Sequence, residues 1–166
     1  GRLPVSLPRS TGQVPVYYNY KNSYRAMTYM DEEAGPLFPF GYGLSYTTFA
    51  CQHFHTEISP AEGNEDLQVT VSCTVENTGD RDGKETLQLY VGIPEEGQPK
   101  MVLRAFQKTA VPAGEQKELS LTLHQQDFAT YSPEETCFIA KPGTYHLYAG
   151  TSAENILYHT TVELTF

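Results

Sequence analysis

The chain has 166 residues, a formal net charge of −9, 12 tyrosines, 8 phenylalanines and no tryptophan. Because nucleic-acid binding rests on clustered Lys and Arg, this acidic balance argues against nucleic acid and against an anionic membrane surface as partners. No run of eighteen apolar residues is present, so the sequence predicts no membrane-spanning helix. A chain of this length holds one large domain, or one domain with an added segment.

Residues 1–48 are expected to form an arm and linker, and the start at Gly1 in place of Met indicates a piece of a longer polypeptide. Prolines interrupt the early apolar alternation, which suits an edge strand or an extended segment. The tyrosines that follow are interleaved with polar residues, so they can bind a sugar or pack on a neighbouring domain. Packing is favoured, because the arm cannot bury these rings against itself, and alone it is expected to be partly disordered. The tyrosines are Tyr17, Tyr18, Tyr20, Tyr24 and Tyr29.

Residues 36–49 are too broken by Pro and Gly for a helix and too aromatic for a solvated linker. Pro36 and Pro39 favour extended or turned backbone before them, and Gly41 and Gly43 relax it around Tyr42. We therefore predict a docked joint between two bodies and place the domain boundary between residues 48 and 49. The domain-packing candidates are Tyr17, Tyr18, Phe38, Phe40, Tyr42 and Tyr46.

From Phe49 to the last residue, apolar side chains alternate with a period of two, which indicates half-buried strands. The clearest runs cover residues 67–75, 87–91 and 119–123, and turn signals such as that at residues 59–64 separate them. In a further strand over 102–108, Leu103 and Phe106 are the expected core anchors. Seven or eight short strands without a convincing helix predict an all-β, immunoglobulin-like (fibronectin type III-like) β-sandwich over 49–166.

Tyr145 follows the turn at Pro142-Gly143-Thr144, where immunoglobulin-like domains place a tyrosine corner. Its hydroxyl is expected to tie the strand to the preceding loop. The Cys-Trp-Cys core of antibody domains is missing, since the chain has no tryptophan. The fibronectin type III-like variety, which needs no disulfide, therefore fits better.

The three cysteines, Cys51, Cys73 and Cys137, form no C-x-x-C motif, so neither a zinc knuckle nor a redox motif is predicted. Free thiols in a reducing compartment are the favoured interpretation, and one disulfide with a leftover thiol is the alternative. Unpaired thiols favour the cytoplasm slightly, while a periplasmic or secreted location stays open.

Three groups of adjacent carboxylates are candidates for a glycosidase acid and nucleophile pair, namely Glu95-Glu96, Glu134-Glu135 and Asp31-Glu32-Glu33. All lie in turn-rich polar stretches, which indicates solvated loop tips instead of separately tuned catalytic groups. The sequence also lacks a Gly-x-Ser-x-Gly nucleophile elbow. No catalytic residue and no cofactor site is predicted.

His53 and His55 lie two apart in a predicted strand, so they would share a face and could chelate a metal with a third ligand. Nothing nearby supplies that ligand with a familiar spacing, so a surface or interface role is favoured and no metal site is predicted. His124, His146 and His159 stand alone in the sequence.

Long runs of the chain closely resemble the C-terminal part of family 3 glycoside hydrolases, the β-glucosidases and β-xylosidases. Residues 1–19 resemble the end of their α/β sandwich domain, and residues 36–49 resemble the joint into their fibronectin type III-like domain. Motifs of that domain follow in order, as Val75-Glu76-Asn77-Thr78-Gly79, Gln88-Leu89-Tyr90-Val91, Leu103-Arg104-Ala105-Phe106-Gln107-Lys108, Pro112-Ala113-Gly114-Glu115 and Pro142-Gly143-Thr144-Tyr145. Departures from the family pattern are confined to Ala105 and Lys100-Met101-Val102.

The resemblance implies a parent enzyme that is a retaining, exo-acting β-glycosidase, with an Asp nucleophile and an acid/base carboxylate upstream of the matched runs. No position of this chain inherits either role. The chain would be a non-catalytic accessory domain that packs on the parent's catalytic domains. A carbohydrate-binding module and a free-standing immunoglobulin-like interaction module are the alternatives. Self-association through the arm is also open.

Overall fold

The structure of the protein is a computed structural model that describes residues 1–13, 16–21, 33, 35–60 and 66–166. Tyr24, Tyr29, Asp31, Glu32 and most of the predicted turn at 59–64 lie outside the described residues. The remainder is sufficient to place both sheets, the joint and much of the arm.

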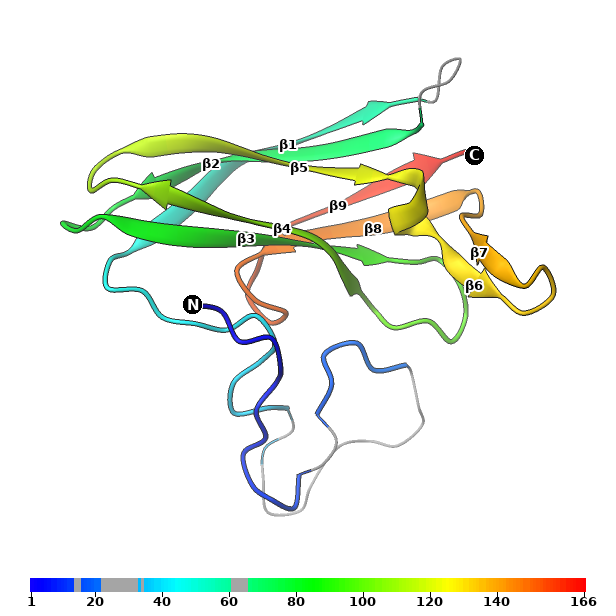
Figure 1. Cartoon of the computed structure of the whole chain (residues 1–166), viewed down its shortest axis with the longest axis horizontal. Helices are drawn as coiled ribbons and strands as arrows, with labels where there is room; N and C mark the ends of the chain where they lie inside the picture. Colours follow the sequence, from blue (N-terminus) through cyan, green and yellow to red (C-terminus); the bar gives the residue numbers. More distant parts are fainter. Residues whose placement is uncertain (14–15, 22–32, 34, 61–65) are drawn as a thin grey trace.

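Two antiparallel sheets stack face to face (Figure 1). The first has the order β1-β2-β5, with β1 at Phe49–Ser59, β2 at Gln68–Asn77 and β5 at Gln116–His124. The second has the order β4-β3-β8-β9, with β3 at Gly83–Gly92, β4 at Val102–Val111, β8 at Gly143–Gly150 and β9 at Ile156–Leu164. A short 3-10 turn, η1 (Gln125–Phe128), and a hairpin of β6 (Thr130–Ser132) and β7 (Cys137–Ile139) connect β5 to β8. The predicted all-β, fibronectin type III-like sandwich is confirmed.

The core lies between the sheets and is built by the alternation seen in the sequence. On β2, Val69, Val71 and Val75 are fully buried, while the intervening side chains face outward. Each such side chain contributes on the order of 2 kcal/mol on leaving water. At the side where β1 and β9 meet, Phe54 stacks on Tyr158 with ring centroids 5.1 Å apart, which closes the open edge of the sandwich.

Strand β3 differs from the other strands because side chains on both of its faces are buried. Its inward residues, such as Leu87 and Leu89, join the core as predicted. Its outward residues Thr86, Gln88 and Tyr90 are also buried, although alternation alone would leave them in solvent. Figure 1 shows why, because the arm lies beneath the sheet that contains β3.

The expectation that Phe106 anchors the core is wrong, since its side chain is 66% exposed. The register of β3 against β4 shifts between Leu89 and Tyr90, where Ala105 and Leu103 are the partners, so β4 contains one extra residue. Such a bulge changes which side chains face the core. Leu103 and Phe106 consequently lie opposite the outward residues Tyr90 and Gln88.

Asn77, at the end of β2, connects the joint, two loops and the sandwich. Its fully buried amide donates to the carbonyls of Arg81 (2.7 Å) and Val111 (2.9 Å). Its oxygen accepts from the Thr47 hydroxyl (2.7 Å) and the Gly79 N–H (3.2 Å). All four side-chain hydrogen bonds need an amide with this orientation.

We predict that Asn77→Asp lowers the free energy of unfolding by about 3 kcal/mol at neutral pH, because a buried carboxylate would face two carbonyl oxygens and could not donate. Those carbonyls would raise the pKa of the introduced carboxyl in the folded state. The loss of stability therefore grows as the pH rises from the unfolded pKa to the folded pKa, and it shrinks at lower pH, where the protonated acid donates again. Urea unfolding followed by circular dichroism measures both effects.

The matched control is Thr70→Ala, which removes an exposed hydroxyl pair with Thr122 (3.0 Å). It should change the free energy of unfolding by no more than about 0.5 kcal/mol. An Asn77→Asp variant as stable as this control at neutral pH would contradict the assigned role.

Candidate functional site

The arm and the joint meet the outer face of the β4-β3-β8-β9 sheet through a second apolar cluster. Tyr90, Met101 and Ala153 are buried there, and Tyr18 and Phe40 pack against them. The ring of Tyr18 stacks on that of Phe40 with centroids 4.3 Å apart and meets Tyr90 edge-on at 5.8 Å. The hydroxyl of Tyr18 also accepts the backbone N–H of Leu103 at 3.1 Å. This cluster covers the outward side of β3.

A buried polar contact fixes the joint beside this cluster. The Tyr90 hydroxyl donates to Gln88 Oε1 at 2.6 Å, and Gln88 Nε2 donates to the carbonyls of Thr151 (2.7 Å) and Gly41 (3.2 Å). Burial raises the pKa of Tyr90, so its hydroxyl stays protonated as the donor. The N–H of Ala153 donates to the carbonyl of Phe40 at 2.9 Å, which adds a backbone tie.

The arm and the joint are also bonded to each other. Backbone N–H groups of Leu3 and Leu7 donate to the carbonyls of Tyr42 and Phe38, both at 2.8 Å. The side chain of Gln13 is buried, and it accepts from the N–H of Arg9 and donates to the carbonyl of Gly35, both at 2.7 Å. These bonds make residues 1–13 and 35–43 one irregular unit.

The Arg2 side chain links the start of the arm to β3 and to the joint. The Arg2 guanidinium pairs with the nearly buried Glu85 carboxylate and donates to the Gly43 carbonyl at 3.0 Å. Because Glu85 is on β3, this pair reaches from the arm to the sheet that carries Gln88 and Tyr90.

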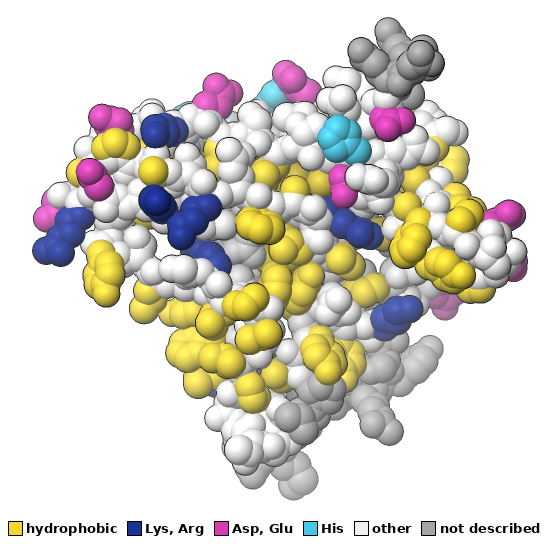
Figure 2. Space-filling model, viewed as in Figure 1, with side chains coloured by type: hydrophobic (Ala, Val, Ile, Leu, Met, Phe, Trp, Pro, Cys, Tyr) yellow, Lys and Arg dark blue, Asp and Glu magenta, His cyan; other side chains and the backbone are white. Residues whose placement is uncertain are grey.

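Several apolar side chains of the arm and the joint are exposed to solvent, and we call them the arm surface. Figure 2 shows hydrophobic side chains gathered over the arm, below the sandwich. Leu44 and Tyr46 are the most exposed, at 80% and 94%. The members are Val5, Leu7, Tyr17, Leu37, Phe38, Leu44 and Tyr46.

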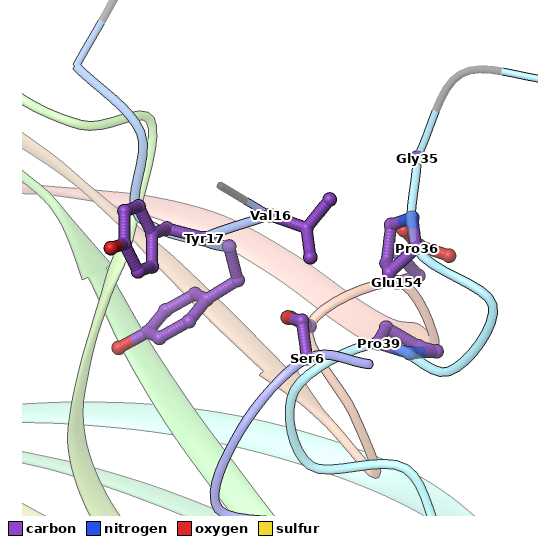
Figure 3. A pocket seen from close by; sticks show the side chains of 9 residues that line it. Ser6, Val16, Tyr17, Gly35, Pro36, Pro39 and Glu154 are labelled. Carbon is purple, nitrogen blue, oxygen red and sulfur yellow. The ribbon is translucent and has the colours of Figure 1, made fainter. Parts of the chain in front are cut away.

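Hollows of about 230 and 270 Å³ lie beside the arm surface. In the first, Val16 and Tyr17 lie on one side and Pro36 and Pro39 on the other, with Ser6 between them (Figure 3). The second is lined by the joint and by outward side chains of β3 and β4, including Phe106. Both are open and mostly apolar, so they suit side chains of a partner better than a polar substrate.

The six domain-packing candidates divide into three pairs. Tyr18 and Phe40 pack on the sandwich. Phe38 and Tyr42 stack on each other with centroids 5.0 Å apart, Phe38 remaining partly exposed. Tyr17 and Tyr46 project into solvent.

The adjacent carboxylates are distributed as solvated or locally paired groups. Glu95 pairs with Lys141 and accepts from the Thr130 hydroxyl at 3.1 Å, and the bond to Lys141 lowers the pKa of Glu95. Glu96, Glu134 and Glu135 are exposed. Among the described residues, no group of three or more His, Cys, Asp or Glu side chains is arranged to hold a metal ion.

The histidines are arranged differently from the sequence expectation. The register of β1 shifts between Gln52 and His55, and His53 has a positive φ of 55°, so the alternation behind the predicted His53–His55 pair is broken. His55 is beside Glu57 instead, at 3.3 Å. The structure brings together His146 and His159, which are thirteen positions apart in the chain. Only the register of β8 against β9 could have indicated this pair.

All three cysteines are free thiols. Cys73 faces the core and Cys51 packs against it from the neighbouring strand. The interaction with the Cys73 thiol, followed by burial, raises the pKa of Cys51. Cys137 is exposed on the hairpin.

Comparison with known proteins shows which domains this sandwich is similar to. Residues 85–153 match the "Fibronectin type III-like domain". The chain matches a small C-terminal part of β-glucosidases and β-xylosidases of glycoside hydrolase family 3, in agreement with the motifs in its sequence.

Among its relatives is the "Periplasmic beta-glucosidase" of Salmonella typhimurium, which is 34% identical over 94% of this chain and 22% of that protein. A "Putative beta-xylosidase" of Formosa agariphila is 35% identical over 92% of this chain and 20% of its own length. The chain therefore spans about a fifth of the curated relatives it matches.

Solved structures agree with these matches. A β-glucosidase involved in saponin metabolism from intestinal bacteria superposes with a TM-score of 0.87 at 34% identity, over 99% of this chain and 22% of that chain. The Listeria innocua β-glucosidase in complex with glucose gives a TM-score of 0.83 at 34% identity, over 98% of this chain and 24% of its own. A fibronectin type III-like domain that forms a fraction of such enzymes fits a non-catalytic accessory domain of a β-glucosidase-like hydrolase.

In the described residues, no helix is long and apolar enough to span a bilayer.

The contact between Gly41 and Gln88 gives a direct test of how the arm is held. Gly41 has a positive φ of 81°, and an added Cβ would overlap the Gln88 amide. We predict that Gly41→Ala raises hydrogen exchange at the amides of Leu3 and Leu7, which bond the joint, because the joint must lift from β3. The amides of the β2 core should stay protected. Hydrogen exchange resolved by residue measures both.

The control is Gly97→Ala, which has a similar φ of 78° but open space around the added Cβ. This control should lower the free energy of unfolding by about 1 kcal/mol, from backbone strain alone. Gly41→Ala should lower it by about 2 kcal/mol more, because its added Cβ also overlaps the Gln88 amide. Equal exchange profiles for the two variants would show that the joint is not held by this contact.

Proposed function

We propose that this chain is the non-catalytic C-terminal accessory domain, with its connecting arm, of a β-glucosidase-like glycoside hydrolase. In this proposal the arm surface packs on the catalytic domains of the same polypeptide. The observation that carries it is the exposure of Leu44, Tyr46 and their apolar neighbours on a segment that is itself bonded to the sandwich. Apolar side chains exposed in this number mark an interaction surface more often than a free one.

We propose residues 1–48 as the arm and linker from the preceding catalytic α/β sandwich domain, and 49–166 as the fibronectin type III-like domain. The start of β1 at Phe49 supports this boundary. Within the arm, Tyr18, Phe40 and Tyr42 would hold the sandwich side, while Tyr17, Phe38 and Tyr46 would contact the catalytic side.

We assign no catalytic residue to this chain and propose that the parent enzyme hydrolyses β-linked glycosides with retention, from the chain end. The names of the relatives, β-glucosidases and β-xylosidases, support this substrate class. The paired or exposed state of Glu95 and Glu96 supports the absence of catalysis here, because a glycosidase needs two separately tuned carboxyls.

For the compartment, we propose the periplasm ahead of the cytoplasm. The name of the Salmonella relative supports it, against the slight preference that unpaired thiols gave.

Carbohydrate binding is a second candidate, favoured by one observation on the hairpin. Tyr131 and Phe138 are both exposed and lie edge to face with centroids 5.5 Å apart. Exposed rings of this kind can contact a sugar. Saturable binding of a glucan or xylan by the chain, lost in Phe138→Ala, would support this candidate.

Without the catalytic domains, the arm surface also favours association of the chain with a second copy. Sedimentation of the chain at rising concentration detects such association.

In the complete polypeptide, we predict that Leu44→Ser and Tyr46→Ser together lower the melting temperature, because apolar area that packs on the catalytic domains is lost. Burial of each side chain contributes on the order of 2 kcal/mol there. In the 166-residue chain the same pair should change little, because both side chains are already in solvent. Calorimetry of the two proteins gives the comparison.

The matched control is Tyr131→Ser, which removes an exposed ring far from the arm surface and should be neutral in both proteins. An unchanged melting temperature in the complete polypeptide would contradict the packing proposal. Turnover of a nitrophenyl β-glucoside by the pure chain would contradict the absence of catalysis.

We further propose that Tyr145 is the tyrosine corner of the sandwich. Its hydroxyl donates to the carbonyl of Lys141, four residues upstream, at 2.6 Å, and burial raises the pKa of Tyr145. Its ring meets that of Phe128 edge-on at 5.1 Å.

Tyr145→Phe keeps this ring packing and removes only the hydroxyl, so the free energy of unfolding should fall by about 1.5 kcal/mol. Urea unfolding measures the change, with the exposed Tyr131→Phe as the control. Equal stability of the two variants would remove Tyr145 from this role.

A further inference from the structure

Two histidine rings from neighbouring strands converge on the outer face of the sandwich. His146 on β8 and His159 on β9 have Nδ1 and Nε2, respectively, 3.1 Å apart. In the antiparallel register His146 is opposite Thr161 and His159 is opposite Tyr148, so the two histidines are diagonal neighbours. Their rings are nearly parallel, with an interplanar angle of 14°.

The surrounding residues hold both rings in this arrangement. The Tyr148 ring stacks on His159 with centroids 4.6 Å apart and lies nearly parallel to His146 at 6.1 Å. On the other side of His146, β3 places Gly92, where an added Cβ would approach His146 Cβ to 3.2 Å. The strand pairing fixes the backbone of both histidines, so only the rotation of the two rings has to be ordered when a ligand binds.

The distance between the two nitrogens matches two ligands of one metal ion. With metal–nitrogen bonds of about 2.0–2.1 Å, nitrogens 3.1 Å apart subtend about 100° at the metal, between square-planar and tetrahedral angles. Without a metal, a proton must lie between the two nitrogens for them to attract. A change of tautomer in the donor ring alone moves its proton to the far nitrogen, so that both facing nitrogens carry a lone pair. The ring centroids are 5.4 Å apart, so the two nitrogens face each other head-on, and each ring has to turn before both lone pairs point at one metal ion.

We propose that His146 and His159 form a binding site for a divalent transition-metal ion of the nickel, copper or zinc class. Imidazole nitrogen selects these ions over calcium and magnesium, which prefer oxygen. Water completes the coordination, because the described residues offer no cluster of three ligating groups. The affinity is therefore weaker than that of a structural zinc site with four protein ligands.

Two features of the charge distribution have opposite effects on cation binding at this site. The net charge of −9 attracts cations over a long range. The Lys100 ammonium lies 5.9 Å from the centre of the Tyr148 ring and works against a bound cation. This inference is independent of the proposed accessory function, since it rests only on β8, β9 and their neighbours.

The test is calorimetric titration of Ni²⁺ into the 166-residue chain and its variants. The unchanged chain should bind one equivalent, and either His146→Asn or His159→Asn should raise the Kd by about tenfold or more, because a single imidazole remains. The controls are His55→Asn and Cys137→Ser, which remove other exposed ligands on the first sheet and on the hairpin. Both should leave the Kd unchanged.

Thermal unfolding gives a second readout that does not depend on the calorimetric signal. A metal that bridges β8 and β9 binds only the folded chain, so excess Ni²⁺ should raise the Tm of the unchanged chain and of both controls. The shift should vanish in His159→Asn, whose exposed side chain can be replaced without disturbing the fold. A Kd in the His146 and His159 variants equal to that of the unchanged chain, loss of binding in a control, or no binding to the unchanged chain would each overturn the proposal.

Discussion

Burial of β3 on both faces is the constraint on which the rest of the structure depends. One face joins the core between the sheets through Leu87 and Leu89, and the other is covered by the arm through Gln88 and Tyr90. An antiparallel sheet normally leaves one face in water, so a polar side chain such as Gln88 is expected outside. Here it is buried and needs partners, which the carbonyls of Gly41 and Thr151 supply.

This arrangement changes how the arm is understood. An irregular segment that only carried exposed rings would have no reason to stay on the sheet. The arm and the joint stay there because they supply hydrogen-bond partners to buried polar side chains of the sheet. Lifting it would leave Gln88 without the Gly41 carbonyl and would expose the Tyr18–Phe40 stack to water. The described part of the arm therefore behaves as a third layer on the sandwich.

Much of the fold could be predicted from the sequence because its physical signal is local. Alternation at Val69, Val71 and Val75 identified an inward strand face without any tertiary information. Phe106 was misplaced because a bulge opposite Tyr90 has no clear sequence signature. The burial of Gln88 depends on a contact with residues more than forty positions away, so no local pattern could indicate it.

The candidate site was predicted in outline and not in detail. The density of proline, glycine and aromatic residues identified the joint. This composition does not predict that Phe40 turns towards the sheet while Tyr46 turns away from it. The direction of each ring is set by hydrogen bonds between distant backbone segments, such as Leu3 with Tyr42. His146 and His159 were missed for the same reason, because their meeting depends on strand register.

The hydrogen bonds and the salt bridge that hold the arm affect the free energy with which the arm surface can bind another domain. Loose apolar side chains on a flexible segment would lose conformational freedom on association, at about 0.5–1.5 kcal/mol for each ordered side chain and more for the backbone. In this chain, Gln13 and Gln88 bond the backbone of the joint, and Arg2 pairs with Glu85, before any partner is present. The backbone beneath Phe38 is thereby already ordered. Association then has to order side chains only, so a modest apolar area can be sufficient to hold the domain in place.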